Sequence, residues 1–174
     1  MPGSVVWLTG LSGSGKTTLA QGLKERLDEM DIQCYVLDGD VLRRGLCSDL
    51  GLSPEDRNEN IRRTSEVAAL LADAGLVAIC AFISPYTKGR AEARSRTDRP
   101  FLEVHVKCSI EECKRRDPKG LYARFDAGEF TGMTGIDAPY EEPSNPELVV
   151  DTGSCDVESC LDALVASLRA GNAI

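Results

Sequence analysis

The sequence predicts an α/β protein in which a five-stranded parallel sheet lies between two layers of helices. Five apolar runs of strand length alternate along the chain with amphipathic stretches of helical length. Strands that alternate with helices pair in parallel and are covered on both faces. A glycine-rich turn also joins the first apolar run to the first helical stretch. In such sheets ligands bind at the carboxyl ends of the strands.

Each element is predicted from its own periodicity. In the first helix Leu19, Leu23 and Leu27 fall on one face, and apolar residues of the last helix share a face in the same way. The expected strands are 4–9, 34–37, 76–82, 101–106 and 147–150. The expected helices are 19–30, a long one ending near residue 74, 88–98, one through residue 112, and one from about residue 157.

Residues 117–146 interrupt this alternation with prolines and glycine turns. A long irregular segment inside a compact domain indicates a functional lid or a disordered insert. Its start, KRRDPKGLYAR (residues 114–124), holds five basic residues against one acid. A basic lid at about 117–137 would close on phosphates and exclude water. A solvated linker is the alternative.

Size and composition indicate one domain and argue against a nucleic-acid partner. A chain of 174 residues with 42% hydrophobic residues can bury one core, so we expect a single domain over 1–174. Its net charge of −8 is unsuited to binding nucleic acid, which needs a broad basic face. The negative charge belongs to residues 101–174, which hold 14 acidic and 7 basic residues.

The apolar runs predict a protein that does not enter a membrane. None approaches the roughly 20 residues that a span needs, and the start of the chain lacks the pattern of a signal segment. We therefore expect a cytoplasmic protein with no membrane partner. In that reducing compartment most of the seven cysteines are expected to be small buried residues.

The stretch GLSGSGKT, residues 10–17, matches the phosphate-binding pattern G-x-x-x-x-G-K-[ST]. Its glycines let backbone N–H groups point at phosphate oxygens, and the following helix adds positive potential. Lys16 is expected to bridge the outer phosphates, and the Thr17 hydroxyl to hold Mg²⁺. A plain turn at a helix start would explain neither residue. The predicted phosphate site comprises Gly10, Ser12, Gly13, Ser14, Gly15, Lys16, Thr17 and Thr18.

The nucleotide is predicted to be ATP. A regulatory GTPase has the same loop but also needs an Asn-Lys-x-Asp run to read guanine, which this sequence lacks. The loop alone does not establish phosphoryl transfer, so residues for an acceptor are needed.

Asp38 and Asp40 follow the second strand, whose end lies beside the phosphate loop in this fold class. One acid can orient or deprotonate an attacking hydroxyl, and the other can hold the acceptor or a water on Mg²⁺. Alternatively, Asp40 caps a helix that begins at Val41.

Basic side chains close to these acids indicate an anionic acceptor. Arg43 and Arg57 favour a second anion, because arginine forks onto carboxylate and phosphate groups and the loop already serves the ATP phosphates. Asn60 lies in the same stretch. Arg63 fits equally well on a solvated helix face, paired with Glu59 four residues away.

The third central strand ends in Ser84, and Pro85 then turns the chain out of the sheet. The hydroxyl of Ser84 can contact a ligand or cap the helix that follows. His105, inside the fourth strand, is expected to be buried and not to act as a base. Trp7, in the first strand, is expected in the core.

Together these segments resemble the adenylylsulfate (APS) kinase family of P-loop kinases, over roughly residues 4–168. Those enzymes phosphorylate the 3′-hydroxyl of adenosine 5′-phosphosulfate with MgATP to give PAPS and ADP. The resemblance implies a P-loop NTPase-type three-layer sandwich, ATP and Mg²⁺ as cofactors, APS as substrate, a place in sulfate assimilation and a homodimer. It rests on GLSGSGKTT, LDGDVLR, RNENIRR, FISPY, RDPKGLY, TGIDAPYE and CDV, in that order.

The resemblance also implies the roles of individual residues. Asp38 approaches the 3′-hydroxyl and, with Thr17, Mg²⁺, while Lys119 stabilises the transferring phosphoryl group. The implied catalytic residues are Asp38, Lys16, Lys119 and Ser84, although direct in-line transfer needs no phosphorylated Ser84. The implied APS-binding residues are Asp40, Arg43, Leu52, Arg57, Asn60, Ile83, Ser84, Lys119, Gly132 and Met133.

Leu52 and Met133 depart from the family, in which two phenylalanines are expected to sandwich the APS adenine. Losing two stacking faces costs on the order of 1 kcal/mol each, which affects APS affinity more than chemistry. Two other functions stay open: a kinase of another small molecule, such as a sugar or nucleoside monophosphate, and a nucleotide-binding regulatory protein that no longer turns over.

Overall fold

The computed structural model describes residues 3–174 and confirms the predicted fold class. Met1 and Pro2, at the start that is predicted to hold no signal segment, lie outside the described residues. Five strands form one sheet in the order β2-β3-β1-β4-β5, and each neighbouring pair is parallel. The strands are β1 (Ser4–Thr9), β2 (Cys34–Asp38), β3 (Val77–Ala81), β4 (Phe101–Lys107) and β5 (Leu148–Asp151).

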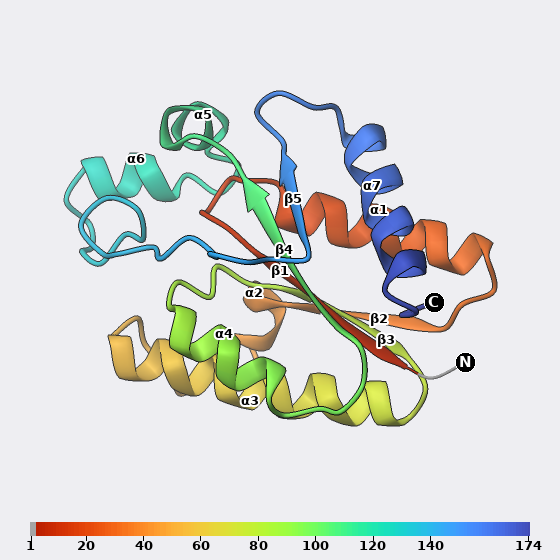
Figure 1. Cartoon of the computed structure of the whole chain (residues 1–174). Coiled ribbons are helices and arrows are strands. Elements are labelled where there is room, and N and C mark those ends of the chain that lie inside the picture. Colours follow the sequence, from red (N-terminus) through yellow and green to blue (C-terminus); the bar gives the residue numbers. More distant parts are fainter. Residues whose placement is uncertain (1–2) are drawn as a thin grey trace.

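Helices cover both faces of this sheet (Figure 1). Helices α1 (Lys16–Glu29) and α7 (Val157–Ala170) pack on one face, and α3 (Pro54–Asp73) and α4 (Thr87–Arg94) on the other. Three short helices lie near the carboxyl ends of the strands: α2 (Gly39–Leu42), α5 (Ile110–Arg116) and α6 (Leu121–Asp126). Within residues 3–174, no helix combines the length and apolar character needed to cross a membrane.

Strand β1 is the centre of the sheet and is buried on both faces. Val6 and Leu8 belong to the apolar core under α1 and α7, whereas Val5 and Trp7 belong to the core under α3 and α4. Trp7 stacks on Phe82 and Phe101 with ring centroids 5.7 and 5.9 Å apart, which confirms its predicted place in the core. An uninterrupted apolar run is the pattern of a strand covered on both sides.

Helix starts follow local capping signals, with one correction to the sequence prediction. The Ser53 hydroxyl accepts the N–H of Asp56 at the start of α3. The alternative in which Asp40 caps a helix from Val41 is wrong. Helix α2 begins at Gly39, and the carboxylate of Asp38 accepts the N–H of Asp40 at 2.9 Å. Because this cap uses one oxygen of Asp38, the other stays available to the phosphate loop.

The segment 117–146 is more ordered than its sequence pattern suggests. It contains α6, whose 6 residues are too few to show a helical period. Tyr122 and Met133 are buried in a small apolar cluster with Cys108 and Cys113 from the end of β4 and from α5. This cluster, which we call the lid core, holds the segment against the rest of the domain.

The cysteines are free thiols, and most of them are buried, as expected from the sequence. Cys34 is half-buried and Cys155 is exposed, whereas the other cysteines are buried. Burial raises the pKa of the Cys160 thiol, which favours its protonated form.

The stability of the domain is expected to depend on the core under α1. Leu23→Ala removes a fully buried side chain and should lower the free energy of unfolding by about 2–5 kcal/mol. Leu70→Ala, on α3, is the matched control because that leucine is 70% exposed, and it should change stability by less than about 0.5 kcal/mol. Urea unfolding measures both, and similar losses in the two variants would contradict the assigned core.

Candidate active site

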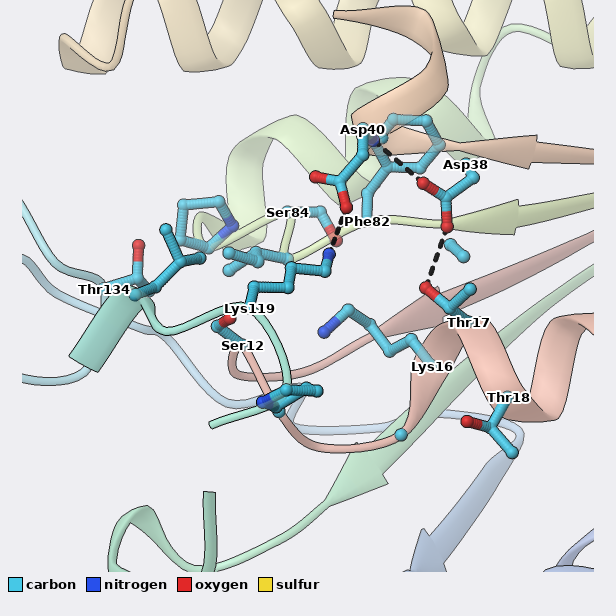
Figure 2. Close-up of a pocket in the computed structure, with 18 of the residues that line it drawn as sticks. Ser12, Lys16, Thr17, Thr18, Asp38, Asp40, Phe82, Ser84, Lys119 and Thr134 are labelled. Carbon is cyan, nitrogen blue, oxygen red and sulfur yellow. Dashed lines mark hydrogen bonds and ion pairs between the residues drawn. The ribbon is translucent and has the colours of Figure 1, made fainter. Parts of the chain in front are cut away.

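A cavity of about 840 Å³ opens at the carboxyl ends of the central strands. Residues from the phosphate loop, the end of β2, the end of β3 and the lid segment line it (Figure 2). Residues near the start of α3 line it as well. Of the site residues predicted from the sequence, all but Gly10 and Ser14 are among the lining residues. The tertiary structure thus brings the predicted nucleotide and acceptor residues to one space.

The phosphate loop lies where the sequence predicts, between β1 and α1. Gly13 and Gly15 have φ values of 80° and 95°, a left-handed conformation that costs glycine little and other residues more. A Cβ at Gly13 would also meet the carbonyl oxygen of Cys113 at 2.9 Å. Glycine is therefore required for both the turn and its close packing against α5.

Lys16 is buried inside the loop. Its ammonium group donates to the carbonyl oxygens of Gly10 at 2.9 Å and Leu11 at 2.6 Å. Burial, and then the nearby charge of Lys119, lowers the pKa of Lys16 to about 8. The site therefore holds a partly desolvated cation at the place where a polyphosphate would compensate its charge.

Asp38 and Asp40 face the phosphate loop and the lid, respectively (Figure 2). The Thr17 hydroxyl donates to Oδ2 of Asp38 at 2.8 Å, which joins the end of β2 to the start of α1. The carboxylate of Asp40 pairs with the ammonium of Lys119, which reaches across from the lid. Both acids predicted for the site thus border the space above the loop.

Thr17 and Asp38 also form an oxygen donor pair that suits Mg²⁺. Within the described part of the chain, no group of three or more histidine, cysteine or acidic side chains is arranged as a metal site. One hydroxyl and one carboxylate fit an ion that takes its remaining ligands from phosphates and water, as Mg²⁺ does at nucleotide sites.

Two arginines shape the opposite wall of the cavity. Arg57 donates to the carbonyl of Gly132 and to the hydroxyl of Thr134, both at 2.6 Å, and burial lowers the pKa of its guanidinium. Arg43 donates to the carbonyl oxygens of residues 50–51. These arginines therefore order the loop before α3 and the lid segment while they bring positive charge to the wall.

Asn60 carries an unpartnered polar group into this wall. Its side chain is 3% exposed and lines the cavity. Among residues 3–174, its amide nitrogen finds no hydrogen-bond acceptor. Because a buried donor without a partner costs about 1–3 kcal/mol, the amide favours a ligand that brings an acceptor there.

Ser84 is held in a left-handed conformation, with φ of 40°, at the end of β3. Its hydroxyl accepts the indole N–H of Trp7 at 3.2 Å, and its carbonyl accepts a guanidinium N–H of Arg90 at 2.7 Å. The alternative in which Ser84 caps the next helix is wrong, because α4 begins at Thr87 with Tyr86 as its N-cap. Ser84 and the preceding Ile83 line the cavity instead.

Leu52 and Met133, the two departures from the family pattern, both line the cavity. Met133 is buried in the lid core, whereas Leu52 is 49% exposed on the loop before α3. One of the two apolar side chains is thus fixed by packing and the other is half-exposed at the rim.

His105 and Arg63 lie away from the cavity. His105 is buried against the ring of Tyr140, and burial lowers the pKa of the imidazole, as expected for a structural histidine. Arg63 pairs with Glu59 at 2.8 Å and with Asp49 at 2.6 Å, which favours the solvated helix face of the two alternatives.

One side of the cavity was missed from the sequence. Thr152, Cys155, Val157 and Cys160 line it after the end of β5. Their position beyond the carboxyl end of a parallel strand was the available signal. Cys155 and Val157 lie in the CDV motif of the family resemblance, which gave them no role in the site, and Thr152 and Cys160 lie in no local motif.

Comparison with known proteins identifies the family. The adenylylsulphate kinase family model matches residues 2–151. The adenylyl-sulfate kinase of Clostridium acetobutylicum is 52% identical over 167 residues, which cover 96% of this chain and 84% of that protein. The probable adenylyl-sulfate kinase of Halalkalibacterium halodurans is 53% identical over 167 residues, covering 95% and 83%. The Mycobacterium tuberculosis APS kinase, solved in complex with AMPPNP and APS, has a TM-score of 0.94 and 46% identity, covering 97% of this chain and 98% of that one. This chain therefore belongs to the adenylylsulphate kinase family of P-loop kinases.

Proposed function

We propose that this protein transfers the γ-phosphate of ATP to the 3′-hydroxyl of APS, giving PAPS and ADP. One observation carries the proposal: a single cavity joins a phosphate loop to two acids and to a wall with arginines and an unpartnered amide. The M. tuberculosis relative of known structure was solved with an ATP analogue and APS together.

The ATP phosphates lie in the loop of residues 10–18 in this proposal, with Lys16 on the outer phosphates. The nucleoside then extends toward Cys155, Val157 and Cys160, which line the same cavity. Thr17 and Asp38 hold Mg²⁺, which neutralises charge on the phosphates when it is bound.

APS occupies the wall opposite the loop. Arg43 and Arg57 supply positive charge for its phosphosulfate, and Asn60 donates to an acceptor atom of the ligand. Asp40 holds the ribose. The remaining contacts come from Ile83, Ser84 and Gly132, with Leu52 and Met133 against the adenine.

The chemistry is an in-line displacement. The 3′-oxygen of APS forms a bond to the γ-phosphorus as the bond to the ADP oxygen breaks, and the hydroxyl proton passes to the carboxylate of Asp38. Asp38 is held for this role by Thr17 and by the N–H of Asp40. Lys119 turns from Asp40 to the transferring group and stabilises its charge.

The proposal extends to the organisation of the protein. We infer one catalytic domain over 1–174 with a lid at about 117–137, a cytoplasmic location and a homodimer. The lid core and the contact between Lys119 and Asp40 support the lid. Sedimentation velocity of the purified protein tests the dimer.

An acceptor comparison tests the function directly. The purified protein is mixed with MgATP and with APS, AMP or gluconate, and ADP release is measured. We expect APS, and neither AMP nor gluconate, to accelerate ADP release. Equal rates with and without APS would refute the proposal, acceleration by gluconate would indicate a sugar kinase, and ATP binding without transfer would indicate a regulatory protein.

Lys119→Ala should lower kcat for APS phosphorylation by about 10²–10³-fold, because one preorganised charge on the transferring group is lost. Lys114→Ala is the matched control, since Lys114 lies on the exposed side of α5. Steady-state kinetics of both variants check this. An unchanged kcat in Lys119→Ala would remove the lid lysine from the mechanism.

Asn60→Ala should raise the Kd for APS by about three- to tenfold, the worth of one hydrogen bond. Asn58→Ala, at an exposed position of the same helix, should leave the Kd unchanged. Calorimetric titration of APS in the presence of ADP measures both values. Equal affinity in the two variants would place the acceptor elsewhere.

Nucleotide affinity should fall as pH rises above 8. The pKa of Lys16 is about 8 without nucleotide, and phosphate oxygens favour the charged form and raise it. Binding above pH 8 therefore takes up a proton, so the affinity falls by up to about tenfold per pH unit. Below pH 8 the lysine is charged in both states and this effect disappears.

Titrations of ADP between about pH 7 and pH 9.5 check this dependence. Lys16→Met lacks the titrating group and should bind weakly with a flat profile over the same range. A flat profile in the unaltered protein would show that the Lys16 ammonium is not the group that binds phosphate.

A further inference from the structure

Two carbonyl groups of the phosphate loop are held by hydroxyls from outside it. The phenol of Tyr122, on lid helix α6, donates to the carbonyl oxygen of Ser12 at 2.8 Å. The hydroxyl of Thr152, just after β5, donates to the carbonyl oxygen of Ser14, also at 2.8 Å. The two bonds reach alternate peptides of the same loop.

Holding these oxygens fixes the direction of the N–H groups that follow them. In a trans peptide the C=O and N–H bonds point in opposite directions. Fixing the carbonyls of Ser12 and Ser14 outward therefore turns the N–H groups of Gly13 and Gly15 toward the loop interior. The left-handed φ values of these glycines allow this alternation. Successive N–H groups that point into one concavity form an anion site.

Both hydroxyls are themselves oriented by neighbouring residues. The carboxylate of Asp117 accepts the N–H groups of Tyr122 and Ala123, which fixes the start of α6. Tyr122 is 2% exposed, and burial raises the pKa of its phenol, so it stays protonated as a donor.

On the other side, Arg116 of α5 donates to the hydroxyl of Thr152 at 3.2 Å and to its carbonyl at 2.6 Å. Glu112 holds the same guanidinium at 2.8 Å. The Thr152 hydroxyl accepts from Arg116, and the nearer acceptor for its own hydrogen is the carbonyl oxygen of Ser14 at 2.8 Å, ahead of that of Lys107 at 3.4 Å.

We propose that Tyr122 and Thr152 are positioning residues that preorganise the phosphate loop, and that Tyr122 also couples the loop to the lid. The inference rests on the proposed use of this loop for the ATP phosphates. The coupling follows from connectivity, because α6 begins two residues after Lys119 and carries the Tyr122 phenol. A lid that leaves the loop loses the hydrogen bond to Ser12, so ordering of the loop and closure of the lid favour each other.

The test compares the binding of ligands that carry phosphates with the binding of a ligand that has none. Tyr122→Phe and Thr152→Val remove one hydroxyl each, and affinities for ADP, AMPPNP and adenosine are measured by calorimetry or by competition. We expect ADP and AMPPNP to bind about three- to tenfold more weakly to each variant, whereas adenosine, which has no phosphates, binds as before. Thr152→Ser restores the hydroxyl and should restore ADP affinity. Tyr35→Phe, at an exposed tyrosine of β2, should change nothing.

Kinetics with APS separate the two hydroxyls. Thr152→Val should raise the KM for ATP and leave kcat unchanged, because it acts on the loop alone. Tyr122→Phe should raise the KM and also lower kcat, because the lid that carries Lys119 is no longer tied to the loop. An unchanged kcat in Tyr122→Phe would overturn the coupling.

Two results would overturn the positioning role. One is an equal loss of adenosine and ADP affinity, which would mean that the hydroxyls only stabilise the fold. The other is full ADP affinity in both variants. The binding comparison uses no acceptor, so a protein that fails to phosphorylate APS would refute the proposed function and leave this test intact.

Discussion

The buried ammonium of Lys16 is the constraint on which the site depends. Removing a charge from water is costly unless polar groups or an opposite charge replace the solvent. The carbonyls of Gly10 and Leu11 provide part of that replacement, and the pKa near 8 shows that it is incomplete. A polyphosphate completes it, so the loop is built to be most stable with its nucleotide bound.

The acids at the end of β2 belong to the same electrostatic arrangement. Asp38 and Asp40 favour the charged form of Lys16, whereas Lys119 opposes it. The pair between Asp40 and Lys119 brings the lid lysine into the site beside the second acid. In the proposed reaction the nucleotide and the acceptor enter between these charges, which explains why acids and bases follow each other so closely in the sequence.

The cavity wall that carries Arg43, Arg57 and Asn60 shows how far residue identity alone could be interpreted. Arg43 and Arg57 were predicted from their charge, but the structure shows that both also order backbone segments. Asn60 was assigned to the APS site only through the family resemblance. Its burial without an acceptor makes it one of the strongest indications of a ligand at that wall. Leu52 and Met133 reach the cavity as predicted, with unequal freedom to pack against a base.

The sequence by itself determined the five strands, the phosphate loop and the family, because these depend on period, on local turns and on short motifs. It also predicted Asp38 beside Thr17, since the ends of parallel strands meet at one edge of a sheet. Only the tertiary structure decided that Tyr122 holds Ser12 and that Thr152 holds Ser14, across 110 and 138 residues of chain. Such contacts leave no periodic or local signal, because they depend on how the lid and the end of β5 pack around the loop.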